Sequence, residues 1–331
     1  MNNIYEAISG SSVALIGMCK NSGKTTVLNK ILELMPDGVI TALTSIGRDG
    51  EEVDLVTRTP KPRIFVRPGT IFATAKNLLA VSDVTLEILR STGFSSPLGE
   101  IFVVRALSGG FVQLSGPSMT EQMLDLKKAL INLADKIIID GALSRKSLSI
   151  PTLCDCCVLC AGAACSPSME KVVEETAHAA GLLNTEVLPD QKALDILHEN
   201  SEKRLILIDK NYTISTFFTE TNLAPAALCE CLTPDTRIIF AAGAVTDAFV
   251  RNLPPEISLV ASDASKLLLS KRAVDKLRQK RIRLFVLNKI NLAAVCINPV
   301  SPDGNNFDKG LFLERMQGAV RQPVFDVKQC V

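Results

Sequence analysis

The sequence has few histidines, tyrosines and tryptophans, and it has almost no net charge. Among its 331 residues are two histidines, two tyrosines and no tryptophan. His178 and His198 stand in no pattern with cysteines or carboxylates that indicates a triad or a metal site, so histidine-based catalysis is not predicted. The 36 basic and 35 acidic residues leave a net charge of +1, too little to hold a polyanion by a long-range field. We therefore expect no nucleic-acid partner.

Long apolar runs are also missing. No stretch reaches the roughly 18–20 apolar residues that a membrane-spanning helix needs. A secretory signal begins with basic residues followed by an apolar stretch. The opening residues Met-Asn-Asn-Ile-Tyr-Glu do not have this pattern. We expect a cytoplasmic protein with no membrane association. Its 10 cysteines are spread through apolar runs of a long chain, which predicts reduced thiols rather than a disulfide framework.

What the sequence does have is a regular alternation of short β-branched runs with longer segments of helical period. This alternation predicts an α/β fold, with a mainly parallel sheet flanked by helices. In the first part of the chain, strands are expected at residues 13–17, 39–43, 63–66, 101–104, 136–140 and 157–160. Helices covering the sheet are expected at residues 25–34 and 122–133.

A second series of predicted strands follows, at residues 205–208, 237–240, 257–260, 284–287 and 293–297. Polar residues 199–203 precede this series and follow a helical stretch, so we place a domain boundary near residue 200. This gives a first domain over residues 1–200 and a C-terminal α/β domain of unassigned role over residues 201–331. No glycine-rich or proline-rich linker marks the boundary, and one sheet shared by both halves is the alternative.

The strongest functional signal is the segment Gly17-Met-Cys-Lys-Asn-Ser-Gly-Lys-Thr-Thr26. It follows a buried strand and opens a helix, which is the context that a phosphate-binding P-loop requires. In that geometry the loop N–H groups surround phosphate, Lys24 contacts phosphate oxygens and the Thr25 hydroxyl binds Mg²⁺. Residues 1–200 are therefore predicted to be a P-loop NTPase domain that binds ATP or GTP with Mg²⁺. The residues expected to bind the nucleotide are Lys20, Asn21, Ser22, Gly23, Lys24, Thr25 and Thr26. An ordinary Gly-Lys turn at a helix start is the alternative.

The loop departs from the usual spacing at its first glycine. Counting back from Gly23, that position is held by Met18, and the nearest glycine, Gly17, stands one residue too early. Lys20 is not at the second loop position, where dimerising ATPases with a deviant loop carry a signature lysine. Activation by a partner's lysine is therefore not predicted.

Two carboxylates are candidates to act beside the loop. Asp140 ends a predicted strand and could hold the water shell of Mg²⁺, although a solvated strand end is the alternative. Asp49 lies in the loop 44–51, where it could polarise a nucleophile or bind Mg²⁺ through water, while Arg48 could meet phosphate charge. A plain Asp-Gly turn is the alternative for Asp49. The predicted catalytic residues are thus Lys24, Asp49 and Asp140, and the predicted metal ligands are Thr25 and Asp140.

Other patterns have simpler interpretations. Cys157 and Cys160 belong to an apolar strand whose alternate side chains face opposite sides, so the cysteines at 154–160 are not expected to converge on a metal. Residues 285–291 resemble the guanine motif Asn-Lys-x-Asp, but Asn291 replaces the Asp. We predict a hairpin turn between two strands there, and no guanine preference. The basic stretch 266–283 has apolar residues at helical spacing, which predicts the solvated face of an amphipathic helix.

Four segments together, residues 13–26, 44–51, 139–142 and 297–302, resemble the smaller reactivase subunit associated with lysine 5,6-aminomutase. The resemblance implies a nucleotide-driven role in exchanging inactivated cofactor on a cobalamin- and pyridoxal-phosphate-dependent aminomutase of lysine fermentation. It also implies a second partner, a larger ATPase subunit resembling mismatch-repair ATPases. Lys24, Thr25, Asp49 and Asp140 carry over as nucleotide or Mg²⁺ residues because they lie in the matching segments.

Several functions fit these residues. The favoured hypothesis is an NTPase, with ATP preferred, that assists reactivation or maturation of a cobalamin-dependent aminomutase. A small-molecule kinase or ATP-dependent ligase is the first alternative, and a non-catalytic nucleotide-gated adaptor is the second. A metallochaperone-like GTPase is also conceivable from the cysteines, although the strand geometry and the missing guanine Asp weigh against it.

Overall fold

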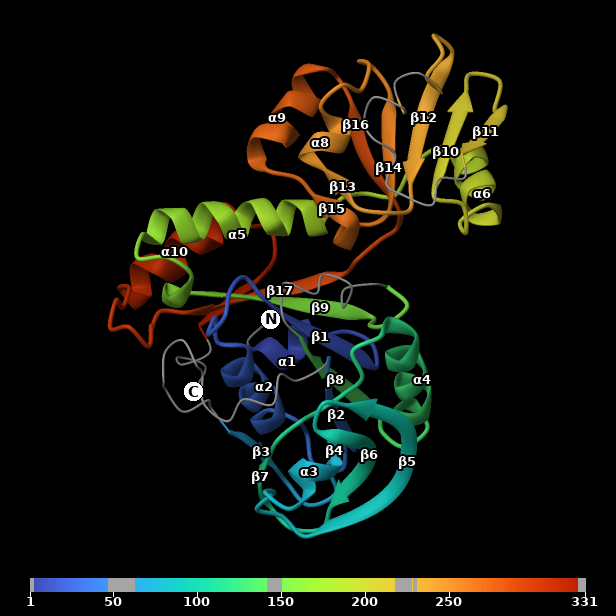
Figure 1. The fold of residues 1–331 in the computed structure, drawn as a ribbon. Coiled ribbons are helices and arrows are strands. Elements are labelled where there is room, and N and C mark those ends of the chain that lie inside the picture. Colours follow the sequence, from blue (N-terminus) through green and yellow to red (C-terminus); the bar gives the residue numbers. More distant parts are fainter. Residues whose placement is uncertain (1–2, 47–62, 142–150, 218–227, 229–230, 327–331) are drawn as a thin grey trace. The chain divides into compact units, whose positions relative to one another are not determined.

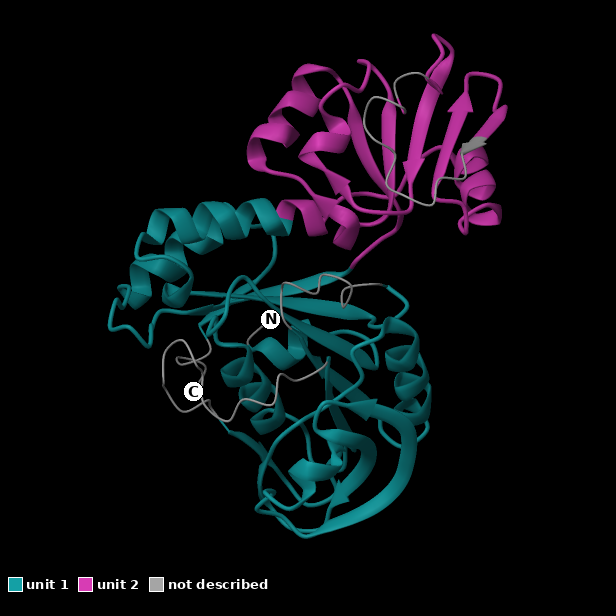
Figure 2. Ribbon diagram, viewed as in Figure 1, with its two compact units in different colours: residues 1–180, 291–331 teal, residues 181–290 magenta. Residues whose placement is uncertain are grey.

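The computed structural model describes residues 3–46, 63–141, 151–217, 228 and 231–326. The chain divides into two compact units, which are coloured separately in Figure 2. The first unit comprises residues 1–180 and 291–331, and the second comprises residues 181–290. The first unit is therefore made from two separate stretches of the chain.

The first unit is built on a sheet whose strand order is β18-β17-β9-β1-β8-β2-β4-β6-β5 (Figure 1). In chain order these strands are β1 (Ser12–Gly17), β2 (Thr41–Ser45), β4 (Ile71–Ala75), β5 (Leu86–Ser96), β6 (Gly99–Ala106), β8 (Lys136–Asp140), β9 (Cys156–Gly162), β17 (Leu292–Asn298) and β18 (Val324–Asp326). Neighbours from β18 to β4 run parallel, and β6 and β5 add an antiparallel edge. A separate antiparallel pair joins β3 (Ile64–Val66) to β7 (Gly110–Val112). The predicted mainly parallel sheet is confirmed.

Helices cover both faces of this sheet. They are α1 (Ile4–Ala7), α2 (Lys24–Glu33), α3 (Lys76–Leu79), α4 (Thr120–Ile131), α5 (Met169–Leu183) and α10 (Lys309–Ala319), with a 3₁₀ turn at Ala163–Cys165. Leu28 and Ile31 of α2 pack with Val13 and Leu15 of β1 in one core, while α4 lies against the opposite face (Figure 1). Burial on both faces accounts for the continuous apolar run of β1. Within the described residues, no helix combines the length and apolarity needed to cross a bilayer.

The second unit has its own sheet, of order β11-β10-β12-β14-β16. Its elements are α6 (Gln191–Glu199), β10 (Leu205–Asp209), β11 (Ile214–Phe217), β12 (Thr236–Ala241), β13 (Val245–Thr246), α8 (Asp247–Val250), β14 (Ser258–Asp263), a 3₁₀ turn (Ala264–Lys266), β15 (Leu267–Leu268), α9 (Lys271–Gln279) and β16 (Arg283–Asn288). β12, β14 and β16 run parallel, and β10 is antiparallel to β11 and β12. The expected second α/β region is therefore present.

The limits of the two units differ from the boundary expected near residue 200. Ala193 and Leu197 of α6 are buried in one core with strands of the second sheet, so this unit begins before residue 200. The chain then returns to the first unit, because β17 pairs with β9 in parallel and Cys157 N–H donates to the Asn291 carbonyl at 2.8 Å. Residues 291–331 belong to the first unit and not to a C-terminal domain.

The hairpin predicted at residues 285–291 is wrong for the same reason. β16 pairs with β14 in the second unit, whereas β17 pairs with β9 and β18 in the first. The segment between β16 and β17 therefore connects two sheets. A connection between two sheets and a tight hairpin turn give the same sequence pattern, because in both a few polar residues separate two strands. The pattern alone therefore cannot distinguish them.

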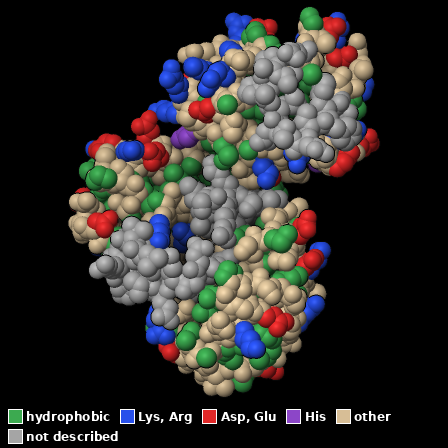
Figure 3. Space-filling model, in the orientation of Figure 1, with side chains coloured by type: hydrophobic (Ala, Val, Ile, Leu, Met, Phe, Trp, Pro, Cys, Tyr) green, Lys and Arg blue, Asp and Glu red, His purple; other side chains and the backbone are tan. Residues whose placement is uncertain are grey.

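The amphipathic helix predicted within the basic stretch 266–283 is confirmed as α9, over a shorter range. Ala273 and Leu277 are buried, while Lys271, Arg272 and Lys276 are exposed. Basic side chains gather over this helix in Figure 3. Their position opposite the buried residues is that of a solvated helix face.

Asp155 holds the start of β1 beside the start of β9. Its carboxylate accepts hydrogen bonds from the backbone N–H groups of Ser11 at 2.7 Å and Ser12 at 2.8 Å, and from the Ser11 hydroxyl at 3.0 Å. Burial alone would raise the pKa of Asp155, but the bonds from Ser12 and Ser11 outweigh it and hold the pKa below its usual value. The folded protein therefore favours the ionised carboxylate.

We expect Asp155→Ala to lower the free energy of unfolding by about 1–2 kcal/mol near pH 7, discounted for solvent exposure. Because the folded-state pKa is depressed, the stabilisation is present above the ordinary carboxyl pKa near 4 and disappears as pH falls through the lowered value. Urea unfolding of both proteins between pH 7 and pH 3 measures the difference. A difference that does not shrink at low pH would contradict this account.

Candidate functional site

The candidate site lies at the carboxyl edge of the large sheet. β1, β8, β9 and β17 are mutually parallel, so their carboxyl ends share this edge. From β1 the chain passes through α2 to β2 on the β8 side, and it later enters β9 on the other side of β1. The connections thus change direction between β1 and β9. In open α/β sheets such a crevice, outside the carboxyl ends of the strands, is the preferred position for a ligand.

The loop from β1 to α2 has a defined turn. The Met18 N–H donates to the Cys160 carbonyl at 2.8 Å, which ties the start of the loop to β9. Asn21 (φ 63°) and Gly23 (φ 95°) adopt left-handed backbone conformations, and the Val27 N–H closes the first helical turn onto the Gly23 carbonyl at 3.0 Å. The first N–H groups of α2 have no helical acceptor and carry the positive end of the helix dipole. This end of α2 can therefore bind an anion.

Lys24 folds back over the loop. A Cβ atom built on Gly17 would lie 2.6 Å from the Lys24 Nζ and would overlap the Ser22 hydroxyl. The ammonium group is thus packed directly against the Gly17 backbone, in space that a side chain at this position would occupy. This contact gives the early glycine a physical role: the residue that must be small is Gly17, at the end of β1, and not Met18.

Asp140 is brought to the same edge by strand register. It ends β8, opposite Leu15 of β1 and Ser45 of β2. Burial raises the pKa of the nearby Cys160 thiol to about 12, with Lys24 opposing the rise and Asp140 adding to it. Both charges therefore act on one thiol of β9. Lys24 and Asp140 therefore both lie near Cys160, at the carboxyl edge of the sheet.

The other predicted site residues differ in how deeply they are buried. Ser22 is buried, Lys20 is exposed, and Asn21, Gly23, Thr25 and Thr26 are partly buried around the loop and the first turn of α2. Thr25 directly follows Lys24 in α2, where its hydroxyl could serve a metal ion together with Asp140. Asp49, with the rest of residues 47–51, lies outside the described residues.

Sequence reasoning missed Asn298, at the end of β17. A Cβ atom on Gly23 would lie 3.0 Å from the Asn298 Cβ, and one on Gly162 would lie 2.7 Å from the Asn298 carbonyl oxygen. The Asn298 side chain also accepts a hydrogen bond from the Val300 N–H at 3.2 Å. This residue therefore packs against the turn between β1 and α2 from the β17 side. The available signal was the polar Asn-Pro pair at the carboxyl end of a buried parallel strand.

The described cysteines of the first unit separate into two groups. Cys154, Cys156, Cys157, Cys160 and Cys296 are buried and form no disulfide. Cys156 and Cys160 belong to one core with Val158, and Cys157 does not, so the alternation predicted for this strand is confirmed. Among the described residues, no group of three or more histidine, cysteine or acidic side chains is arranged to hold a metal ion.

Cys19 and Cys165 differ from the expectation of reduced thiols, because the structure joins them in a disulfide. Their Cα atoms are 5.4 Å apart although the residues are 146 positions apart in the sequence. Sequence spacing could not indicate this pair. It becomes visible only once β1 and β9 are known to be neighbours.

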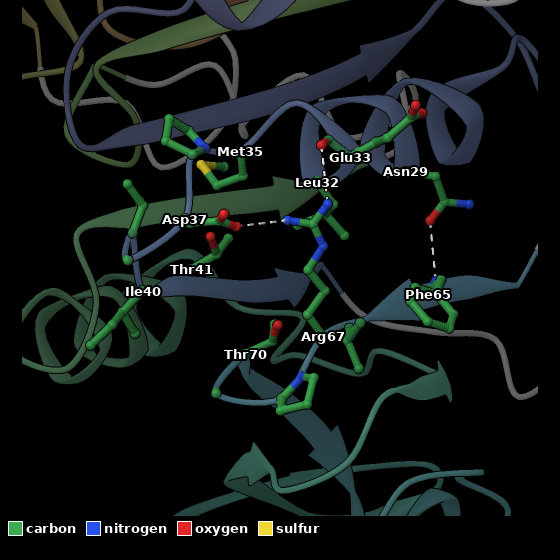
Figure 4. Close-up of a pocket in the computed structure, with 16 residues that line it drawn as sticks. Asn29, Leu32, Glu33, Met35, Asp37, Ile40, Thr41, Phe65, Arg67 and Thr70 are labelled. Carbon is green, nitrogen blue, oxygen red and sulfur yellow. Dashed lines mark hydrogen bonds and ion pairs between the residues drawn. The ribbon is translucent and has the colours of Figure 1, made fainter.

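A cavity of about 560 Å³ lies at the opposite, amino-terminal edge of β2 (Figure 4). The Arg67 side chain reaches across it and donates to the Glu33 carbonyl at 3.2 Å, with Asp37 as an ion-pair partner at 3.8 Å. Thr41, the first residue of β2, and Asn29 also line it. The guanidinium is already held by these groups. This cavity is separate from the loop around Lys24.

Comparisons of the chain with protein-family models, with curated proteins and with solved structures found no match.

Proposed function

We propose that this chain is a Mg²⁺-dependent P-loop NTPase, with ATP the favoured substrate, that assists reactivation or maturation of a cobalamin-dependent aminomutase. The observation that carries the NTPase proposal is the packing of Lys24 against Gly17, in a loop between a buried parallel strand and a helix N-terminus. This arrangement provides a cation, backbone donors and a helix dipole around one position. Phosphate is the ligand class that requires all three.

In this proposal each residue has a distinct task. The N–H groups of the loop and of the first turn of α2 hold the phosphate oxygens, and Lys24 neutralises their charge. The Thr25 hydroxyl would ligate Mg²⁺ directly, and Asp140 would hold the water molecules around it. When bound, Mg²⁺ supplies charge neutralisation for the phosphoanhydride that is cleaved. Asp49 remains the proposed group for positioning the attacking water.

The aminomutase role is supported by how the resembling segments lie in the fold. Residues 13–26, 139–142 and 297–302 include the carboxyl ends of β1, β8 and β17 respectively. Three of the four segments therefore reach the same edge of one sheet. This convergence is expected if the resemblance reflects a shared site, because residues that act together must meet in space.

One experiment tests both parts of the proposal. Binding and turnover of ATP and GTP with Mg²⁺ are measured for the purified chain alone, with a cobalamin-dependent aminomutase, and with the aminomutase plus its larger ATPase subunit. We expect tight ATP binding, slow basal hydrolysis and stimulation by the aminomutase components. Binding without stimulation by any component would remove the reactivase role and leave the NTPase proposal standing. Absence of nucleotide binding would remove both.

Phosphoryl transfer to a small acceptor is a second candidate, and buried hydroxyls favour it. The side-chain oxygens of Thr44, Ser45 and Ser115 are buried and have no hydrogen-bond partner among the described residues. Ser45 is in register with Asp140, and a Cβ on Gly116 would lie 2.7 Å from the Thr44 Oγ1. These hydroxyls could bind an acceptor beside the phosphate site. ADP formation that requires a metabolite and no partner protein would favour a kinase or ligase.

Asp140→Asn should separate nucleotide binding from turnover. The neutral amide cannot fully replace a carboxylate in holding the water shell of Mg²⁺, so we expect Mg²⁺-dependent turnover to fall about 100-fold. Binding of ATP without metal should change less than threefold, because the loop and Lys24 are untouched. Asp125→Asn, on the exposed face of α4, is the matched control. Turnover of Asp140→Asn equal to that of the control would exclude Asp140 from the site.

A further inference from the structure

The Cys19–Cys165 pair joins the loop after β1 to the turn after β9. Cys19 lies two residues beyond the end of β1, in the phosphate loop, and Cys165 ends the 3₁₀ turn that follows β9. Their disulfide therefore joins the two segments at which the strand connections change direction. A ligand bound at this point lies against both segments. The disulfide and a ligand bound there would therefore contact the same two segments, those that follow β1 and β9.

These two cysteines also differ from the buried cysteines of the first unit in their surroundings. Both are partly exposed, whereas Cys154, Cys157 and Cys160 are buried and burial raises the pKa of each thiol. Buried protonated thiols react slowly, because the thiolate is the nucleophile and the oxidant must reach it. Among the described cysteines of the first unit, oxidation should therefore be selective for Cys19 and Cys165.

We propose that Cys19 and Cys165 form a reversible redox site that reacts with hydroperoxides and closes the nucleotide site when oxidised. One thiolate attacks hydrogen peroxide, takes one oxygen as a sulfenic acid and releases water after proton transfer. The second thiol attacks the sulfenic sulfur, forms the disulfide and releases a second water. The two thiols lose two electrons and two protons in total, and one peroxide becomes two waters. A dithiol reductant reverses the step by thiol–disulfide exchange.

Oxidation should weaken nucleotide binding because it removes the freedom of the loop. The Met18 N–H is already tied to the Cys160 carbonyl, and the disulfide ties the next residue covalently to the segment after β9. The first half of the loop is then fixed to β9 at two successive residues, Met18 and Cys19. In the reduced protein, Cys19 and Cys165 can separate, and the loop can adjust around a nucleotide. The closure rests on the nucleotide site proposed above.

The test compares the purified chain after treatment with a dithiol reductant and after treatment with hydrogen peroxide followed by its removal. Mass spectrometry of proteolytic peptides identifies the Cys19–Cys165 cross-link, and a fluorescent ATP analogue reports the dissociation constant. We expect at least a tenfold weaker affinity in the oxidised protein, with recovery on renewed reduction. Cys165→Ser and Cys19→Ser should each bind the analogue alike before and after peroxide. Cys231→Ser, which changes a cysteine of the second unit, should respond as the original chain does.

Equal affinity of the reduced and cross-linked proteins would overturn the closure and leave the NTPase proposal intact. Loss of affinity after peroxide in Cys165→Ser would also overturn it, because the effect would then need no disulfide. Absence of analogue binding in the fully reduced chain would instead count against the nucleotide site itself. The two failures are therefore distinguishable in one set of measurements.

Discussion

Lys24→Ala should reduce ATP turnover by about 100-fold to 1,000-fold, which is the usual effect of removing one group that stabilises developing charge in a transition state. The ammonium is packed against Gly17 beside the N-terminus of α2. Alanine is a good helix former, and Lys24 is partly exposed. The variant should therefore fold normally. Turnover is measured by phosphate release and folding by circular dichroism.

The control for this variant is Lys128→Ala, which removes one positive charge from the exposed face of α4. Its ammonium pairs with Asp125 at 3.0 Å, and the side chain is 77% exposed, so its loss should cost only a few tenths of a kcal/mol. Turnover by Lys128→Ala should match that of the original chain within a factor of two. A folded Lys24→Ala protein that retains full turnover would remove the central residue of the proposed site.

The elements around this site were predictable because local and long-range signals agree there. The apolar run at residues 13–17, the Gly-Lys-Thr helix start and the strand ending at Asp140 each carry their own pattern. β8 was predicted with its exact observed bounds, Lys136–Asp140, and α2 begins one residue before the predicted start. Buried parallel strands are continuous apolar runs, so their limits are clear in the sequence. The parallel arrangement then brings their carboxyl ends together.

The features that were not predictable depend on pairing between distant segments. β5 has exposed and half-buried residues along its length, because it lies at the antiparallel edge of the sheet, and its apolar pattern is correspondingly weak. β17 was predicted as a strand but assigned to the wrong half, since nothing in its own residues specifies β9 as its neighbour. The packing of Asn298 against Gly23 follows from that pairing. Strand order therefore determines which distant residues meet at the site, and hydrophobic periodicity does not reveal that order.

Gly17→Ala should weaken ATP binding about tenfold or more, because the new Cβ would occupy the space of the Lys24 ammonium, 2.6 Å from Nζ, and would overlap the Ser22 hydroxyl. Extra volume in a packed site typically costs about 1–3 kcal/mol, which here includes displacement of the charge that the phosphate needs. Isothermal titration with ATP measures the affinity, and thermal unfolding measures the stability. Gly318→Ala is the control, since Gly318 lies in α10 with no heavy atom within 4 Å of its built Cβ, and alanine there should stabilise the helix by about 0.5 kcal/mol.

The double variant Gly17→Ala/Lys24→Ala distinguishes a specific effect from general damage to the loop. If Gly17 acts by leaving room for the ammonium, its substitution should cost much less affinity once Lys24 is already alanine. The sum of the two single losses in binding free energy should then exceed the loss in the double variant. A Gly17→Ala cost that is the same in both backgrounds would show that the glycine serves the loop independently of Lys24. The need for a glycine at residue 17 would then come from the Ser22 hydroxyl, which the new Cβ would also overlap, and the packing of Lys24 against Gly17 would be incidental.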